Sequence, residues 1–252
     1  MLAKINYDDR QHAGYQEGRR LGPEALALWL AAFAEHAPRT RPLAVLDLGS
    51  GTGRFAPALA EAFGGPVCGV EPSARMRALA EAAPHPPAVS YREGCAERIP
   101  LPDASCDLVL MFLSFHHVED RGRGAAEIAR VLRPGGRVFI RSTFADRMPA
   151  LEWHRYFPRA RAIEERMFPS SAEVVRVFAA AGLACLALVP VAVPSVPTLA
   201  ELAARLRTRS ISTFEHLTER EIEEGFARLA AAVAADPARP PAEDPGDLLV
   251  LG

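Results

Sequence analysis

The sequence has almost no lysine, few cysteines and no strong excess of charge. Lys4 is the only lysine among the 252 residues, which excludes a Walker A phosphate loop and a Schiff-base lysine beyond the amino terminus. The four cysteines show no Cys-x-x-Cys pair, so we expect no metal site and no disulfide framework. The formal net charge of -2 gives no electrostatic footprint for nucleic acid, and no nucleic-acid partner is expected.

Long apolar runs are also missing. No uninterrupted apolar stretch reaches the ~20 residues that a membrane-spanning helix needs. The first ten residues lack the apolar centre of a signal peptide. We therefore expect a cytoplasmic protein that has no membrane partner and is a monomer or a homodimer.

Strands and helices alternate along the middle of the chain. The pattern predicts strands at 43–48, 66–71, 89–91, 107–113 and 137–141, with helices at 54–63, 73–82 and 125–132. Such alternation is typical of an α/β fold with a parallel sheet and helices on both faces. The tripeptide Pro134-Gly135-Gly136 is expected to form the turn before the fifth strand.

Segments on either side of this core are expected to shape the ligand side. We divide the chain into a helical cap and linker, residues 1–42, and a main domain, residues 43–252. Substrate-side insertions are expected at about 143–170, where the pattern is irregular and lid-like, and at 194–245.

The later part of the chain carries its own helix and strand signals. Three helix starts follow from capping-box spacing, and two further segments are typical of closing strands. The helix starts are Ser170 with Glu173, Thr198 with Glu201, and Thr218 with Glu221; the strands are 185–193 and 247–251.

A glycine-rich turn follows the first strand. Val45 to Leu48 is an apolar strand run, and Gly49, Gly51 and Gly53 come directly after it. Glycine tolerates positive φ and lets the backbone approach a ligand closely. The dinucleotide fingerprint requires its third glycine where this chain has Arg54, so nicotinamide binding is disfavoured.

The run Asp47-Leu-Gly-Ser-Gly-Thr-Gly53 resembles the first motif of the class I S-adenosylmethionine-dependent methyltransferases. The similarity is to their ubiquinone-type and small-molecule branch, and it extends with ordered motifs over about 43–142. It implies a Rossmann-like, seven-stranded, mostly parallel sheet with helical cap and insertions. It also implies S-adenosylmethionine as cofactor and S-adenosylhomocysteine as product.

Cofactor contacts are expected along the sheet edge. Glu71 closes the second strand, where a carboxylate can accept from both ribose hydroxyls. Asp47 is expected to order the turn and accept from the ammonium group of the cofactor. The resemblance adds a further set of positions: Gly49, Ser50, Gly51, Gly53, Pro72, Met76, Cys95, Ala96, Met111, Phe112, Tyr15 and Arg19.

One of these positions departs from the family pattern. Gly94-Cys95-Ala96-Glu97 resembles a segment in which an aspartate accepts from the adenine amino group, but this chain has Cys95 there. A thiol is a weak acceptor. Adenine selectivity is therefore expected to depend on backbone groups such as that of Ala96.

His116 and His117 follow the fourth strand, at the edge where such folds bind ligands. A neutral imidazole there can take a proton from the attacking group of an acceptor, so either histidine is a candidate base. Bracing of the loop is the alternative. Asp146 is a candidate acid for orienting these histidines. Trp153, Tyr156 and Phe157 are expected to be either pocket walls or ordinary lid core.

The expected function is methyl transfer to an oxygen, nitrogen or carbon of a small-molecule acceptor. The alternative is a protein of the same fold that binds the cofactor but acts as a non-methylating cyclase or binding protein. A nucleotide-dependent oxidoreductase is opposed by Arg54. Six arginines in the insertions fit either an anionic acceptor or a plain surface: Arg155, Arg159, Arg161, Arg205, Arg207 and Arg209.

Overall fold

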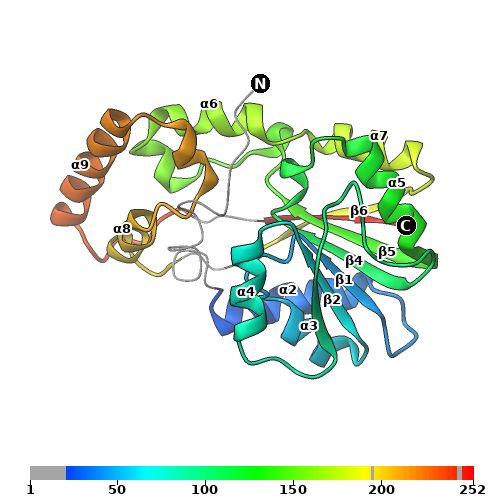
Figure 1. The fold of residues 1–252 in the computed structure, drawn as a ribbon. Helices are drawn as coiled ribbons and strands as arrows, with labels where there is room; N and C mark the ends of the chain where they lie inside the picture. Colours follow the sequence, from blue (N-terminus) through cyan, green and yellow to red (C-terminus); the bar gives the residue numbers. More distant parts are fainter. Residues whose placement is uncertain (1–20, 194–195, 243–245) are drawn as a thin grey trace.

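A seven-stranded sheet forms the centre of the computed structural model, which describes residues 21–193, 196–242 and 246–252 (Figure 1). The strand order is β3-β2-β1-β4-β5-β7-β6, with β1 to β5 parallel and β7 antiparallel to both of its neighbours. This confirms the Rossmann-like fold class. The strands are β1 (Val45–Leu48), β2 (Val67–Glu71), β3 (Val89–Glu93), β4 (Cys106–Phe112), β5 (Leu132–Ser142), β6 (Cys185–Val191) and β7 (Gly246–Leu251).

Helices cover both faces of the sheet (Figure 1). On one face α5 (Arg121–Val131) and α7 (Ser171–Ala180) enclose an apolar cluster. On the other face α2 (Pro23–His36) and α3 (Ala56–Phe63) enclose a second cluster. Because both faces are buried, β1 is apolar at nearly every position, as expected for a central parallel strand.

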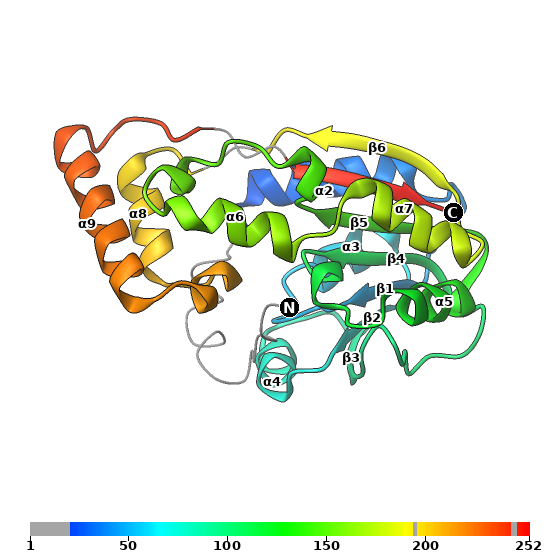
Figure 2. The ribbon, with the colours of Figure 1, turned by 90° about the horizontal axis from the view of Figure 1, so that it is seen from above.

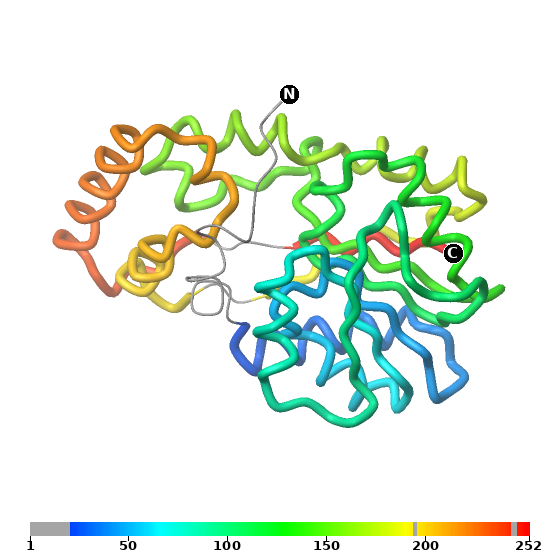
Figure 3. The backbone as a smooth tube through the Cα atoms, viewed as in Figure 1, coloured from blue at the N-terminus to red at the C-terminus, as the bar shows by residue number. Residues whose placement is uncertain are grey.

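A separate group of helices lies beyond the carboxyl ends of the parallel strands (Figures 2 and 3). We call it the lid. It has its own apolar cluster, built around Trp153, Phe157 and Phe214. Its elements are η4 (Glu152–Arg155), α6 (Pro158–Met167), α8 (Leu199–Arg207), η5 (Ser212–His216) and α9 (Glu219–Ala235).

Two expected features differ in the structure. The irregular segment contains the ten-residue helix α6, whose buried face carries the charged Glu164 beside Ala160 and Ile163. A buried charge breaks the apolar period on which a helix prediction depends. Helix α5 begins at Arg121 rather than at residue 125, because the carboxylate of Asp120 accepts from the amide of Arg123.

The turn expected at Pro134-Gly135-Gly136 lies inside β5 instead. Leu132 pairs with Cys106, and the next pair is Arg137 with Leu108. The extra residues of β5 therefore form a bulge opposite β4, with Gly135 at φ 81°. All three expected caps are confirmed, since the hydroxyls of Ser170, Thr198 and Thr218 each accept from an amide three residues later.

The last cap is the start of α9, which packs on α8 and contacts Phe157, between η4 and α6, through Gly225. Substituting Gly225 with alanine would place a Cβ 2.2 Å from Cε1 of Phe157, whose ring is buried. We expect Gly225→Ala to lower the free energy of unfolding by about 1–3 kcal/mol through overpacking. Gly122→Ala in α5 is the matched control, because its Cβ would meet nothing closer than 3.5 Å. It should be neutral or stabilise by up to about 1 kcal/mol. Equal urea midpoints for the two variants would contradict this packing.

Candidate active site

The glycine turn after β1 adopts the backbone that the sequence predicts. Gly49, Gly51 and Gly53 have φ values of 75°, 56° and 74°, all in the left-handed region. The amides of Gly49 and Ser50 donate to the carbonyl of Val70, at 2.7 and 3.2 Å. The turn is thereby fastened to the end of β2.

Side chains from neighbouring strands leave no room at this turn. A Cβ on Gly49 would lie 2.5 Å from Cβ of Ser114, and one on Gly53 would lie 2.2 Å from the hydroxyl oxygen of Tyr91. Ser114 also donates its hydroxyl to the carbonyl of Leu48 at 2.8 Å. The sequence reasoning missed Tyr91 and Ser114. Their contacts arise only when the sheet places β4 beside β1, and β3 on the far side of β2.

Glu71 lies at the end of β2 and is 7% exposed. Its carboxylate accepts from the amide of Gly51 at 2.9 Å and from the amide of Ser73 at 2.9 Å. The acid therefore holds the glycine turn and the start of α4 (Ala74–Ala82) at one point.

Asp47 is buried inside β1, at 3% exposure. Burial raises the pKa of its carboxyl to about 7; the positive charge of Arg54 lowers it and the negative charge of Glu71 raises it further. The hydroxyl of Tyr91 shares this environment, and burial together with the charge of Asp47 raises its pKa to about 12. Two acids, Asp47 and Glu71, thus meet at one edge of the sheet.

The remaining expected contact residues have varied surroundings. Ser50 is buried, and its hydroxyl has no hydrogen-bond partner within the described part of the chain. Pro72 is exposed, and Met76 is buried on α4. Cys95 is half-buried in a bridge with Arg98. Ala96 and Met111 are core residues on the α5 side of the sheet.

Phe112, at the end of β4, lies among rings and guanidinium groups. The centroid of its ring lies 4.4 Å from that of the Phe55 ring and 5.1 Å from that of the Trp29 ring. The guanidinium carbons of Arg54 and Arg141 lie 5.0 and 5.4 Å from the Phe112 ring. This gives the carboxyl edge an apolar wall with positive charge beside it.

The chain turns sharply after β4. Leu113 has φ 57°, a left-handed conformation that costs a non-glycine residue about 1–3 kcal/mol. The following short helix η2 (Phe115–His117) carries both candidate histidines, with ring centroids 3.9 Å apart. The ring of His116 also packs 4.5 Å from that of Phe168, which follows α6. His116 therefore joins the sheet edge to the lid.

Other expected contacts have structural explanations. Asp146 lies in η3 (Ala145–Arg147) and accepts from the amide and the hydroxyl of Ser171, at 2.7 and 2.6 Å. Burial raises its pKa and these hydrogen bonds lower it, with a net lowering. Trp153 and Phe157 belong to the lid core. Tyr15 and Arg19 lie outside the described residues.

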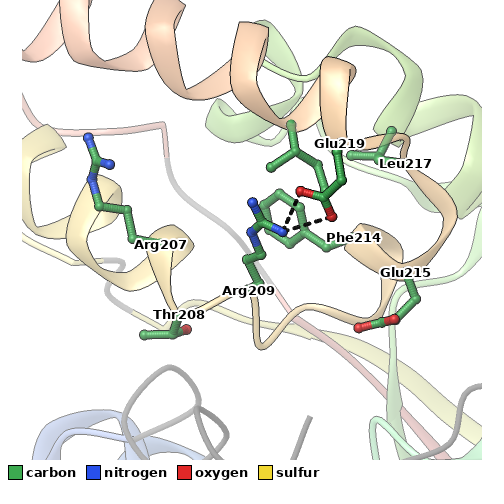
Figure 4. Close-up of a pocket in the computed structure, with 8 residues that line it drawn as sticks. Arg207, Thr208, Arg209, Phe214, Glu215, Leu217 and Glu219 are labelled. Atoms are coloured by element: carbon green, nitrogen blue, oxygen red, sulfur yellow. Dashed lines mark hydrogen bonds and ion pairs between the residues drawn. The ribbon is translucent and has the colours of Figure 1, made fainter. Parts of the chain in front are cut away.

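A cavity of about 250 Å³ opens in the lid (Figure 4). Its wall includes Arg207 and Arg209 but also two glutamates, and both carboxylate oxygens of Glu219 accept from Arg209 at 2.9–3.0 Å. The cavity is smaller than the pockets that usually hold small molecules, which measure about 300–1,000 Å³. Ion pairs also engage arginines elsewhere in the insertions, with partners Glu152 for Arg155, Glu221 for Arg159 and Glu165 for Arg161.

Residues 46–140 match the family described as a methyltransferase domain. This segment of the chain is similar to methyltransferase domains. It spans β1 to most of β5, and so includes the glycine turn, Glu71 and the histidine loop. The resemblance found in the sequence motifs is confirmed.

Curated relatives extend this similarity only part of the way. An uncharacterized methyltransferase of Mycobacterium tuberculosis is 41% identical over 124 residues, which are 49% of this chain and 46% of that protein. A demethylmenaquinone methyltransferase of Deinococcus radiodurans is 38% identical over 115 residues, 44% of this chain and 48% of the relative. The chain thus spans about half the length of the curated relatives it matches.

Solved structures with this fold cover more of the chain. One is a putative methyltransferase from an antibiotic biosynthesis pathway of Anabaena variabilis. The aligned region covers 89% of this chain and 96% of that protein, with a TM-score of 0.74 and 22% sequence identity. The alignment with the [4+2]-cyclase SpnF covers 88% of this chain and 78% of the cyclase, with a TM-score of 0.60 and 18% sequence identity. At such identities the likeness shows the fold alone.

The described residues form neither a membrane-spanning helix nor a cluster of metal ligands. In ranges 21–193, 196–242 and 246–252, every helix is too short or too polar to cross a bilayer. The same ranges contain no group of three or more His, Cys, Asp or Glu side chains arranged to hold a metal ion.

The buried carboxyl of Asp47 predicts how stability depends on pH. Its pKa is about 7 in the folded protein against 3.8 for an unshifted side chain, so the folded state retains a proton that the unfolded state releases. The contribution of this group therefore falls as pH rises from about 4 through 7, by at most about 4 kcal/mol. Urea unfolding of the ligand-free protein at several pH values should show this loss, and Asp47→Asn should lack it. Parallel pH curves for the two proteins would contradict the assignment.

Proposed function

We propose that this protein transfers a methyl group from S-adenosylmethionine to a small-molecule acceptor. The observation that carries the proposal is the glycine turn held between two buried acids, Asp47 and Glu71, within a segment similar to methyltransferase domains. Strand, turn and acid stand in the order that the domain family uses, and Arg54 occupies the position where a dinucleotide site needs glycine.

The residues of this edge fit the cofactor. Glu71 presents a carboxylate that already accepts two N–H groups, which is the chemistry that two ribose hydroxyls require. Asp47 offers a buried carboxyl to the α-ammonium group, whose positive charge would lower the pKa of that carboxyl and favour its ionised form. The hydroxyl of Ser50, inside the glycine turn, is buried and has no hydrogen-bond partner among the described residues, so it is available to a ligand.

The remaining expected contacts support the same proposal. In this proposal Pro72 and Met76 would contact the nucleoside, and the backbone of Cys95 and Ala96 would contact adenine. Met111 is buried, so its contribution is to fix the end of β4. Tyr15 and Arg19 remain predicted contacts from the amino-terminal segment.

Catalysis would rely on placement rather than on covalent chemistry by the protein. When bound, the cofactor supplies an electrophilic methyl group on a positively charged sulfur. Phe112 and its neighbouring rings keep water from the carboxyl edge, and the lid holds the acceptor against it. His116 and His117 stand at this edge as candidates for taking up the acceptor proton.

The alternative function is a non-methylating cyclase or a binding protein that keeps the cofactor as a structural element. Such a protein would bind S-adenosylmethionine but form no S-adenosylhomocysteine with any acceptor. The two functions are therefore separated by product formation and not by cofactor affinity.

Calorimetric titration with S-adenosylmethionine, S-adenosylhomocysteine and NAD tests the cofactor. We expect binding of both sulfur compounds, weakened roughly 10- to 100-fold by Glu71→Gln, because hydrogen bonds to a charged group contribute about 1.5–3 kcal/mol. Glu93→Gln is the matched control, since Glu93 is the register partner of Glu71 on β3 and its side chain is 73% exposed. It should leave the affinity unchanged. Binding of NAD in place of the sulfur compounds would contradict the proposal.

The acceptor class is tested by S-adenosylhomocysteine formation with a panel of phenols, quinols, amines and carboxylic acids. A quinol belongs in the panel because one relative is a demethylmenaquinone methyltransferase. Product formation with one class supports methyl transfer. Cofactor binding without product across the whole panel favours the cyclase or binding alternative.

A further inference from the structure

A buried polar triad lies in the middle of the lid. Nε2 of His154, in η4, is 2.7 Å from Oε2 of Glu164, in α6. The other carboxylate oxygen of Glu164 accepts the hydroxyl of Thr213, in η5, at 2.9 Å. The side chains of His154 and Glu164 are only 9% and 5% exposed. Three separate lid elements thus contribute one side chain each.

The contacts of Glu164 determine the tautomer of the imidazole. A carboxylate accepts hydrogen bonds and donates none, so Nε2 of His154 must carry the proton that Glu164 accepts. In the neutral imidazole, Nδ1 is then an acceptor with a lone pair. It is buried and has no hydrogen-bond partner in the described ranges. Leaving a buried polar atom without a hydrogen-bond partner costs about 1–3 kcal/mol of folding free energy. A fold that keeps such an atom therefore suggests that the atom has a function.

The other buried acid of the lid shows what a purely structural acid does here. Glu152 accepts from the hydroxyl of Tyr156 at 3.0 Å and from Arg239 at 2.5 Å, and its second oxygen accepts from the amide of Ala242 at 3.3 Å. Its charge is balanced by Arg239. Among the described residues no arginine forms an ion pair with Glu164, whose two oxygens contact His154 and Thr213 instead.

The triad lies next to the contact between lid and sheet edge. The amide of Phe168 donates to the carbonyl of Glu164, so the two residues are one helical turn apart, about 6 Å along the axis. The ring of Phe168 in turn packs 4.5 Å from that of His116, on the loop after β4. Figure 2 shows α6 running from the outer lid toward this loop.

We propose that His154, rather than His116 or His117, is the general base for an acceptor that carries a hydroxyl group, and that Glu164 is its positioning residue. This inference rests on the proposed methyl transfer and names its acceptor chemistry. As the acceptor oxygen forms a bond to the methyl carbon, the carbon–sulfur bond breaks and its electron pair stays on sulfur. The hydroxyl proton passes to Nδ1 of His154, and the carboxylate of Glu164 stabilises the resulting imidazolium.

The tautomer is tested by nitrogen NMR of the protein labelled with ¹⁵N-histidine, because protonated and unprotonated ring nitrogens have well-separated shifts. We expect protonated Nε2 and unprotonated Nδ1 for His154, assigned by loss of the signals in His154→Gln. In Glu164→Gln the side chain also has an amide donor, so the preference should weaken. A proton on Nδ1 of His154 in the native protein would overturn the proposal.

The role in catalysis is tested with 4-substituted phenols of increasing acidity, from 4-methoxyphenol to 4-nitrophenol. His154→Gln keeps a donor for Glu164 but removes the base, so the rate with the least acidic phenol should fall roughly 100-fold or more. The deficit should shrink as the phenol becomes more acidic, because an acidic phenol needs less help in losing its proton. Glu164→Gln should show a smaller deficit with the same trend.

Controls separate this role from a structural one. His216→Gln makes the same change at another lid histidine and should leave the rates unchanged, and calorimetry should give one affinity for S-adenosylmethionine in all variants. A deficit of equal size for every phenol would mean that His154 only braces the lid, and it would overturn the proposal. So would a native protein that binds the cofactor but methylates no phenol. A native protein that does not bind the cofactor would overturn the proposed function itself.

Discussion

The close approach of the glycine turn to the end of β2 is the constraint on which the site depends. The amides of Gly49 and Ser50 share the carbonyl of Val70, and the amide of Gly51 donates to Glu71. A Cβ on Gly49 or Gly53 would clash with Ser114 or Tyr91, so the turn can take this place only with glycine at those two positions. The same contact that shapes the backbone therefore orients the acid expected to bind the ribose.

The sheet and the lid contribute different parts of the candidate site. The sheet buries two apolar clusters and fixes the carboxyl edge, where Asp47 and Glu71 remain polar within an otherwise apolar setting. The lid has a third cluster, and inside it the polar triad of His154, Glu164 and Thr213. Phe168, packed on His116, couples the two parts at the position where an acceptor would meet the cofactor.

Much of the fold and of the cofactor edge follows from the sequence, because local signals specify them. Alternating apolar runs give the strands, capping residues give α7, α8 and α9, and glycine spacing gives the turn. What could not be predicted depends on tertiary contacts. Helix α6 was missed because Glu164 interrupts its apolar face, and the triad was missed because its members are 10 and 49 positions apart and form no motif. Tyr91 and Ser114 belong to the same class, since only strand pairing brings them to the glycine turn.

The most direct test of the central claim is a crystal structure of the protein with S-adenosylhomocysteine. We expect both ribose hydroxyls to donate to the carboxylate of Glu71, and the amino-acid end of the ligand to lie over the turn at Gly49–Gly51 with its ammonium group near Asp47. Nucleoside density elsewhere in the molecule, with no ribose hydroxyl bound to Glu71, would contradict the assignment of this edge as the cofactor site.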